Sequence, residues 1–202
     1  VIRIVSFLSK NPKSKIIYVG AGTSARIAVQ DGVELYPTFG WPSKRVRFII
    51  AGGKKALTKS IEGAEDLKNQ NIHEIVKNII KPIDVVIGLA ASGSTKFTVD
   101  VIKLANKSGA LTVGISNNIK SELEKNAIIP IILNTGAEVV AGSTRLKAGT
   151  AQKICLNLIS TLVMTRLGKV KKGMMNNLIA TNRKLSKRKK QIDFLLSRDK
   201  GH

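Results

Sequence analysis

Two stretches of the chain repeat one order: an apolar strand, a loop of small residues, then a helix. In the first, Ile16 to Val19 lead into GAGTS, and helical spacing continues to Phe39. In the second, Asp84 to Leu89 lead into AASGST and a helix to about Ser108. Such a glycine-marked turn brings backbone N–H groups close to a bound anion, although it also serves for packing alone. The repeat predicts parallel strands whose loops meet at one edge of a sheet.

The remaining chain continues this alternation. Three further runs have strand composition: Arg45 to Gly53, Ala110 to Asn118 and Ile128 to Leu133. Three further segments have helical spacing: Lys54 to Ile61, Asp66 to Ile80 and Leu146 to Leu167. The pattern predicts an α/β fold, a doubly wound parallel sheet of about five strands flanked by helices. We assign residues 1–170 to this domain and residues 171–202 to a basic, partly helical tail.

The composition fits such a sheet. Of the 202 residues, 43% are hydrophobic and only 4% are aromatic, so the core is expected to consist of Ile, Val, Leu and Ala. Cys155 is the single cysteine, which excludes an intramolecular disulfide and favours a reducing cytoplasm. The first fifteen residues are too short and too charged for a membrane span, and they lack the pattern of a signal peptide.

The net charge raises the question of nucleic-acid binding. Lys and Arg number 34 against 13 Asp and Glu, which gives +21, and the densest run lies at Arg183 to Lys190. No zinc-finger spacing, aromatic RNA-binding motif or recognition-helix pattern accompanies this charge. We therefore expect the run to be a solvated helix face and nucleic acid to be an unlikely partner.

The two loops favour a phosphorylated ligand. They carry hydroxyl groups at Ser24 and at Ser92, Ser94 and Thr95, which can donate to phosphate oxygens without a metal. A Walker sequence is missing, and the first loop lacks the third glycine of a dinucleotide-binding loop. His73 and His202 cannot complete a zinc site with one distant cysteine. The sequence therefore implies neither a metal nor another cofactor.

Carboxylates are scarce in so basic a chain, so their positions are informative. Glu34 lies near the end of the first helix, Glu65 in the cluster EGAED, and Glu138 after the last predicted strand. Two carboxylates in differently desolvated surroundings can act as general acid and general base. Helix capping and salt bridges are the alternative role for each of them.

Several motifs in the same order resemble those of the N-acetylmuramic acid 6-phosphate etherases. These motifs are GAGTS, PTFG, IAGG, EGAED, AASGST, GSTRLKAGTAQK and ATNRKL. The resemblance implies a sugar-isomerase (SIS) fold, with glucokinase regulatory proteins as distant relatives, and a homodimer with sites near its interface. It also implies a cytoplasmic enzyme of cell-wall recycling that converts N-acetylmuramic acid 6-phosphate into N-acetylglucosamine 6-phosphate and D-lactate.

The resemblance also implies roles for individual residues. Glu34 matches the family's proton donor to the leaving lactate oxygen, and Glu65 matches the partner acid or base; which glutamate performs which transfer stays open. Ser24, Ser92, Ser94 and Thr95 are expected to hold the sugar phosphate. Three further candidates for that pocket lie in GSTRLKAGTAQK: Ser143, Arg145 and Lys147. Loop and helix capping is the alternative role of these polar residues.

The chain departs from the family pattern around Glu34. Ala25 replaces a glycine of the first loop, and Gly32 and Val33 replace two small residues before the glutamate. Glycine within a helix costs about 1 kcal/mol relative to alanine, so we expect Gly32 to loosen this segment. A non-catalytic sugar-phosphate-binding or regulatory module is therefore the first alternative, and an aldose–ketose phosphate isomerase is the second.

The predicted helix Leu146 to Leu167 carries an apolar stripe whose role stays open. The stripe comprises Ile154, Leu158, Thr161 and Leu162. It is expected to be either core or a subunit interface.

Overall fold

The computed structural model describes residues 1–61, 63–64 and 72–198, and it contains one five-stranded parallel sheet. The strands are β1 (Ile16–Gly20), β2 (Val46–Ile50), β3 (Val85–Ala90), β4 (Leu111–Ser116) and β5 (Ile129–Ile132). Their spatial order is β2-β1-β3-β4-β5. The predicted fold class, a doubly wound parallel sheet, is therefore confirmed.

The three central strands are apolar because helices cover both of their faces. Every residue of β1, β3 and β4 is buried, whereas the edge strands β2 and β5 are partly exposed. Alternate side chains of a strand point to opposite faces, so the strands contribute to two separate cores. Tyr18 and Ile87 belong to one core, and Val19 and Val86 belong to the other.

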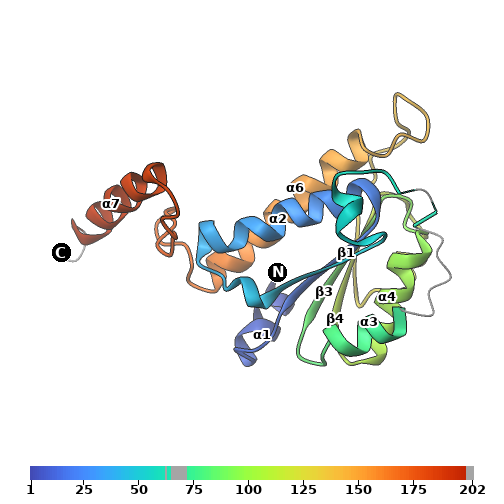
Figure 1. Ribbon diagram of the computed structural model, residues 1–202, viewed down its shortest axis with the longest axis horizontal. Helices are drawn as coiled ribbons and strands as arrows, with labels where there is room; N and C mark the ends of the chain where they lie inside the picture. Colours follow the sequence, from blue (N-terminus) through green and yellow to red (C-terminus); the bar gives the residue numbers. More distant parts are fainter. Residues whose placement is uncertain (62, 65–71, 199–202) are drawn as a thin grey trace.

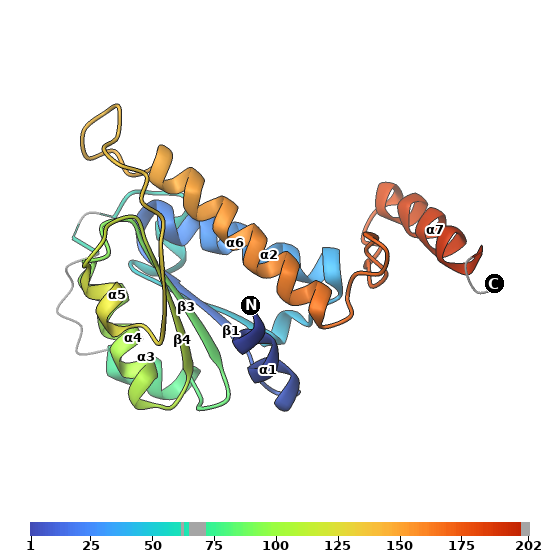
Figure 2. The ribbon, with the colours of Figure 1, turned by 180° about the vertical axis from the view of Figure 1, so that it is seen from behind.

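Helices form a layer on each face of the sheet (Figures 1 and 2). The first core lies under α1 (Ile2–Lys10), α2 (Gly22–Phe39) and α6 (Lys147–Arg166). The second lies under α3 (Ile72–Ile79), α4 (Lys96–Lys107) and α5 (Glu122–Asn126). Helices α2 and α6 lie side by side along the sheet, in blue and orange in both views. No helix in residues 1–61, 63–64 and 72–198 is long and apolar enough to cross a membrane.

Some helices differ from the sequence-based prediction. The segment expected to be helical from Lys54 to Ile61 forms only a short 3-10 helix, η2 (Gly53–Leu57), which begins at the second of two glycines with positive φ, Gly52 and Gly53. Helix α3 begins at Ile72 in the described part of the expected 66–80 helix. Helices α1 and α5 were not predicted. Both are short, nine residues in α1 and five in α5, and each buries only one or two apolar residues.

The chain after α6 turns back onto α2 before it leaves the sheet. Leu178 is buried, and the backbone N–H of Ile179 donates to the carbonyl of Pro37 at 3.1 Å. Helix α7 (Arg183–Arg198), drawn in red, then stands away from the sheet and its helices (Figure 1). Helix α7 includes the densest basic run of the sequence, and its side chains from Lys187 to Lys190 are exposed.

Candidate functional site

The two Ser/Thr-containing loops meet where the strand order reverses. Strands β1 and β3 are neighbours, with Gly20 opposite Leu89, and their loops lead to helices on opposite faces of the sheet. In doubly wound sheets, ligands bind in the crevice that forms at this point, beyond the carboxyl ends of the strands. The fold therefore brings the two predicted phosphate-binding loops together.

In the first loop, Ser24 is part of a buried hydrogen-bonded network. Its hydroxyl donates to Oε1 of Gln152 at 2.8 Å, and Nε2 of Gln152 donates to Oδ1 of Asn117 at 3.0 Å. Nδ2 of Asn117 in turn donates to the carbonyl of Leu133 at 3.1 Å. The network connects the ends of β1, β4 and β5 through α6. The proton of Ser24 is thus directed toward Gln152, a partner 128 positions away in the chain that the sequence did not reveal.

In the second loop, the hydroxyl groups lie at the start of α4. Ser92 and Ser94 are exposed and Thr95 is half-buried, and Thr95 makes no side-chain cap to the helix. The backbone N–H of Ser94 donates to Oγ of Ser92 at 3.2 Å. Gly93 has φ +69°, and a Cβ there would lie 2.4 Å from Oγ of Ser121. The loop therefore requires glycine at this position, and it leaves the hydroxyl groups of Ser92 and Ser94 accessible.

The three candidates of GSTRLKAGTAQK lie around the start of α6. Ser143 is half-buried, whereas Arg145 and Lys147 are exposed. The two oxygens of the Glu138 carboxylate accept from the backbone N–H groups of Lys147 at 3.0 Å and Ala148 at 2.9 Å. Glu138 is thus a cap of α6, which was the alternative role that the sequence left open for it.

A polar pocket of about 240 Å³ lies beside the first loop, and four of the sequence motifs contribute to it: GAGTS, IAGG, EGAED and GSTRLKAGTAQK. Gly22, Thr23 and Arg26 line it from α2, Lys59 and Ser60 from the segment after η2, and Thr144 from the loop before α6. Arg26 orders one wall, because its Nε donates to the carbonyls of Ala56 and Leu57 and its Nη2 to that of Lys59. The sequence did not single out Arg26 or Lys59.

The structure describes one of the two predicted catalytic glutamates, Glu34. Glu34 is exposed on α2. It lies twelve positions after Gly22, and thus about 18 Å along the helix axis from the first loop. Glu65 lies outside the described residues. The structure therefore places Glu34 on the outer surface of the α2–α6 layer, away from the loops of its own chain.

A different carboxylate, Asp31, is buried between β1, α2 and α6. It accepts from the hydroxyls of Tyr18 and Ser160 at 2.9 Å each and from Nδ2 of Asn157 at 3.0 Å. Burial raises the pKa of Asp31, while these hydrogen bonds and nearby Lys153 partly oppose the rise. Burial and the neighbouring Asp31 raise the pKa of Tyr18 well above its ordinary value. Because all its contacts are internal, Asp31 fixes α2 against α6.

Ala25 and the loop around it fit the helix without strain. Ala25 is buried in α2 and is not among the described residues with positive φ. The family's glycine is therefore not required here for backbone conformation.

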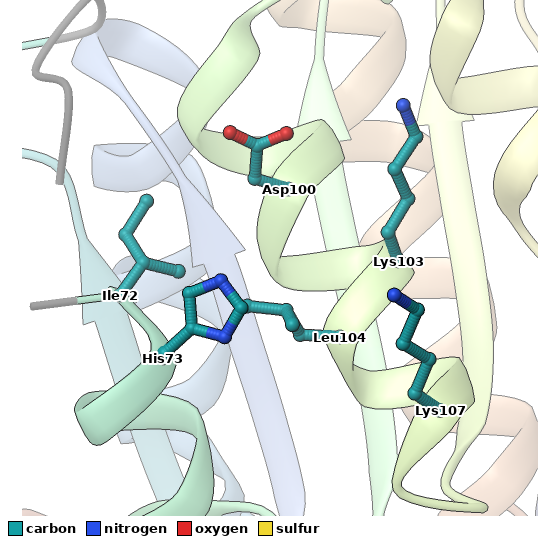
Figure 3. Close-up of a pocket in the computed structure, with 6 residues that line it drawn as sticks. All are labelled: Ile72, His73, Asp100, Lys103, Leu104 and Lys107. Atoms are coloured by element: carbon teal, nitrogen blue, oxygen red, sulfur yellow. The ribbon is translucent and has the colours of Figure 1, made fainter. Parts of the chain in front are cut away.

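A second hollow of about 240 Å³ lies between α3 and α4, lined in part by His73, Asp100, Lys103 and Lys107 (Figure 3). It includes no residue of the two Ser/Thr loops.

Comparison with known proteins identifies the domain. The sequence model of the glucokinase regulatory protein N-terminal SIS domain matches residues 1–106, and that of the SIS domain matches residues 63–162. Among solved structures, the sugar isomerase domain of an RpiR transcription factor from Sphaerobacter thermophilus has a TM-score of 0.58 at 17% identity, covering 95% of this chain and 84% of that one. The C-terminal domain of glucosamine-fructose-6-phosphate aminotransferase from Francisella tularensis has a TM-score of 0.60 at 16% identity, covering 96% and 45%.

Curated sequence relatives are much more similar. An N-acetylmuramic acid 6-phosphate etherase of Bacillus cereus strain AH820 is 48% identical over 193 residues, which are 95% of this chain and 65% of the relative. Another from strain ATCC 10987 is 49% identical over 181 residues, covering 89% and 61%. The chain thus spans less than two thirds of the length of these relatives. It belongs to the SIS-domain family of the glucokinase regulatory protein N-terminal type, and its curated relatives there are N-acetylmuramic acid 6-phosphate etherases.

Proposed function

We propose that the chain is an N-acetylmuramic acid 6-phosphate etherase, a carbon–oxygen lyase. The observation that supports this most strongly is the 48% identity to proteins of that name over 95% of the chain. The SIS domain and the two Ser/Thr-containing loops at the β1–β3 crevice support a phosphorylated sugar as its substrate. A reducing compartment such as the cytoplasm, where the single thiol of Cys155 stays reduced, is part of the proposal.

Ser92, Ser94 and Thr95 would bind the phosphate. Two of these hydroxyls are exposed, and Thr95 leaves the N-terminus of α4 without a side-chain cap. Ser24 would contribute through its oxygen or after release from Gln152, because its proton now points to that amide. Ser143 lies just before α6 and Lys147 is its first residue, at the same edge of the sheet. These two side chains would contact the sugar part of the substrate, whereas the Ser92–Thr95 loop would contact its phosphate.

The chemistry would proceed by elimination and hydration on the ring-opened sugar. A carboxylate of the pair Glu34 and Glu65 removes the proton at C2, the C3–O bond breaks, and the partner acid protonates the leaving lactate oxygen. The resulting C2–C3 double bond is conjugated with the C1 aldehyde. Water then adds at C3 and a proton returns to C2, which gives N-acetylglucosamine 6-phosphate and D-lactate.

A homodimer would bring Glu34 to a substrate. The stripe predicted on α6 is not core: Ile154, Leu158 and Leu162 are 55%, 57% and 46% exposed. It continues into a hollow of about 430 Å³ lined in part by Ile2 and Ile129. Exposed apolar patches of this kind mark protein–protein interfaces. Glu34 lies on the same helical layer, so a second copy on this layer would place Glu34 beside the partner rather than in water.

Lactate release from N-acetylmuramic acid 6-phosphate in heavy water tests the proposal. We expect D-lactate and a product labelled at C2. Glu34→Gln and Glu65→Gln should each reduce turnover about 10²- to 10⁴-fold, since positioned acid–base groups contribute this much. Circular dichroism checks that each variant is folded. A folded wild-type protein that releases no lactate would refute the etherase.

A non-catalytic sugar-phosphate-binding module is the second candidate. The match to the regulatory-protein SIS domain over residues 1–106 and the exposed position of Glu34 favour it. Thermal stabilisation by N-acetylmuramic acid 6-phosphate without lactate release would distinguish this module from the enzyme.

A further inference from the structure

The polar pocket beside the first loop carries positive charge that the proposed chemistry does not use. Arg26 and Lys59 line it, together with the hydroxyl-bearing Thr23, Ser60 and Thr144. None of the described residues that line it is acidic. Neither cation forms a salt bridge with a described carboxylate. A pocket whose described lining carries two cations and several hydroxyl groups favours an anionic group.

Arg26 fixes the shape of this pocket. Its Nε and Nη2 donate to three carbonyls of the 56–59 segment at 3.1–3.2 Å, and so hold Lys59 and Ser60 opposite α2. A guanidinium has five N–H donors, and these contacts use Nε and one hydrogen of Nη2. These three contacts do not use the other N–H donors of Arg26. Arg26 is thus both a wall of the pocket and a source of charge.

The pocket is too small for a whole sugar phosphate. Its volume is about 240 Å³, and Gly22 and Thr23 are among its lining residues. Pockets that enclose entire drug-sized ligands have volumes of roughly 300–1,000 Å³. A short acidic substituent of a larger ligand fits this size, while the rest of the ligand lies along the sheet edge toward Ser92. Neighbouring strands of a sheet are about 4.8 Å apart, so one ligand can reach both loops.

We propose that this pocket binds the carboxylate of the substrate's D-lactyl group, and that Lys59 determines specificity for it. This inference rests on the proposed function, whose substrate carries two anionic groups. The phosphate occupies the Ser92–Thr95 loop, and the carboxylate contacts the ammonium group of Lys59 and the hydroxyl of Ser60. The pocket then distinguishes the lactyl-bearing sugar from the same sugar phosphate without it, because only the former has a second anion to place there.

The assignment is tested by using calorimetry to measure how tightly the Lys59→Gln variant binds two ligands. The ligands are N-acetylmuramic acid 6-phosphate and N-acetylglucosamine 6-phosphate, measured in a Glu65→Gln background that slows turnover. Lys59→Gln should raise the Kd for N-acetylmuramic acid 6-phosphate at least about fivefold, because an exposed charge contact contributes about 1 kcal/mol. The Kd for N-acetylglucosamine 6-phosphate should change by less than about twofold. Lys55→Gln removes the same charge from η2 outside the pocket, and should change neither Kd.

The outcomes separate this inference from the proposed function. Equal weakening of both ligands, or no change in either, overturns the carboxylate pocket even if the wild-type protein releases lactate. Selective loss of the lactyl-bearing ligand in a protein that releases no lactate supports the pocket while refuting the etherase. Failure of the Glu65→Gln protein to bind either sugar phosphate overturns the pocket as well.

Discussion

Gly32 shows how a residue that is unfavourable locally can be required by packing. Within α2 it was expected only to loosen the helix before Glu34. In the structure, a Cβ at this position would lie 2.6 Å from Cε1 of Phe48 and 2.9 Å from Cε2 of Tyr18. These two rings stack with their centroids 5.8 Å apart, directly against the helix. The glycine thus allows α2 to approach β1 and β2 closely.

Gly32→Ala should destabilise the protein by about 1–3 kcal/mol, because overpacking outweighs the gain in helix propensity. Gly149→Ala in α6 is the matched control. Its Cβ would have ordinary contacts at 3.4 Å with Ile27 and Thr23, so we expect no loss of stability. Urea unfolding monitored by circular dichroism measures both. A Gly32→Ala variant more stable than wild type would show that the rings move aside at little cost.

Strand β1 and helices α2 and α6 are connected by one carboxylate. Asp31 receives hydrogen bonds from Tyr18 on β1 and from Asn157 and Ser160 on α6. Its pKa and that of Tyr18 are both raised, so the folded protein retains these protons to higher pH than the unfolded chain. The contribution of Tyr18 to stability is therefore fully present below its unfolded pKa of about 10 and is lost as the pH rises through its folded pKa.

Tyr18→Phe should make stability less sensitive to alkali. The wild-type protein should lose unfolding free energy more steeply than the variant above about pH 10, because only wild type must keep a buried phenol protonated. Urea unfolding at a series of pH values measures this difference in slope. Tyr36→Phe removes the exposed second tyrosine and should follow wild type. Parallel curves for wild type and Tyr18→Phe would contradict the role of this phenol.

At the scale of the whole molecule, the unpaired apolar surface of α6 predicts association. Leu158 lies in the middle of the exposed stripe, between Ile154 and Leu162. Leu158→Asp should convert a dimer into a monomer, since a carboxylate in an apolar interface is strongly unfavourable. Val139→Asp changes a residue that is 92% exposed on a loop outside the stripe and should leave the dimer intact. Light scattering after size exclusion measures the mass; a monomeric wild type would rule out this interface.

The sheet could be predicted from the sequence because its central strands are apolar without interruption. The periodicity of Ile72 to Ile80 likewise predicted a helix whose buried residues include Val76. The α6 stripe could not be assigned to core or interface, since both require the same apolar spacing. The structure answers the question, because α6 packs on α2 while Ile154 stays exposed.

The candidate site was predictable only where its residues are close in sequence. The motifs GAGTS and AASGST predicted the two loops. The loops lie close together because the strands that precede them, β1 and β3, are neighbours in the sheet. The partnership of Ser24 with Gln152 and the position of Lys59 beside Thr23 depend on tertiary packing between distant segments. No local pattern encodes such contacts, so the direction of the Ser24 hydroxyl and the cationic pocket emerged only from the structure.

The cap that Glu138 places on α6 has a consequence for where an anion can bind. Helices α2, α4 and α6 all begin beyond the carboxyl ends of the strands, and the positive end of each helix dipole attracts negative charge there. At α6 the chain's own carboxylate already neutralises that end, whereas the N-caps of α2 and α4 provide no side-chain acceptor. Glu138 thus acts as an internal counterion that repels an incoming anion from α6 and leaves the starts of α2 and α4 as its favourable destinations.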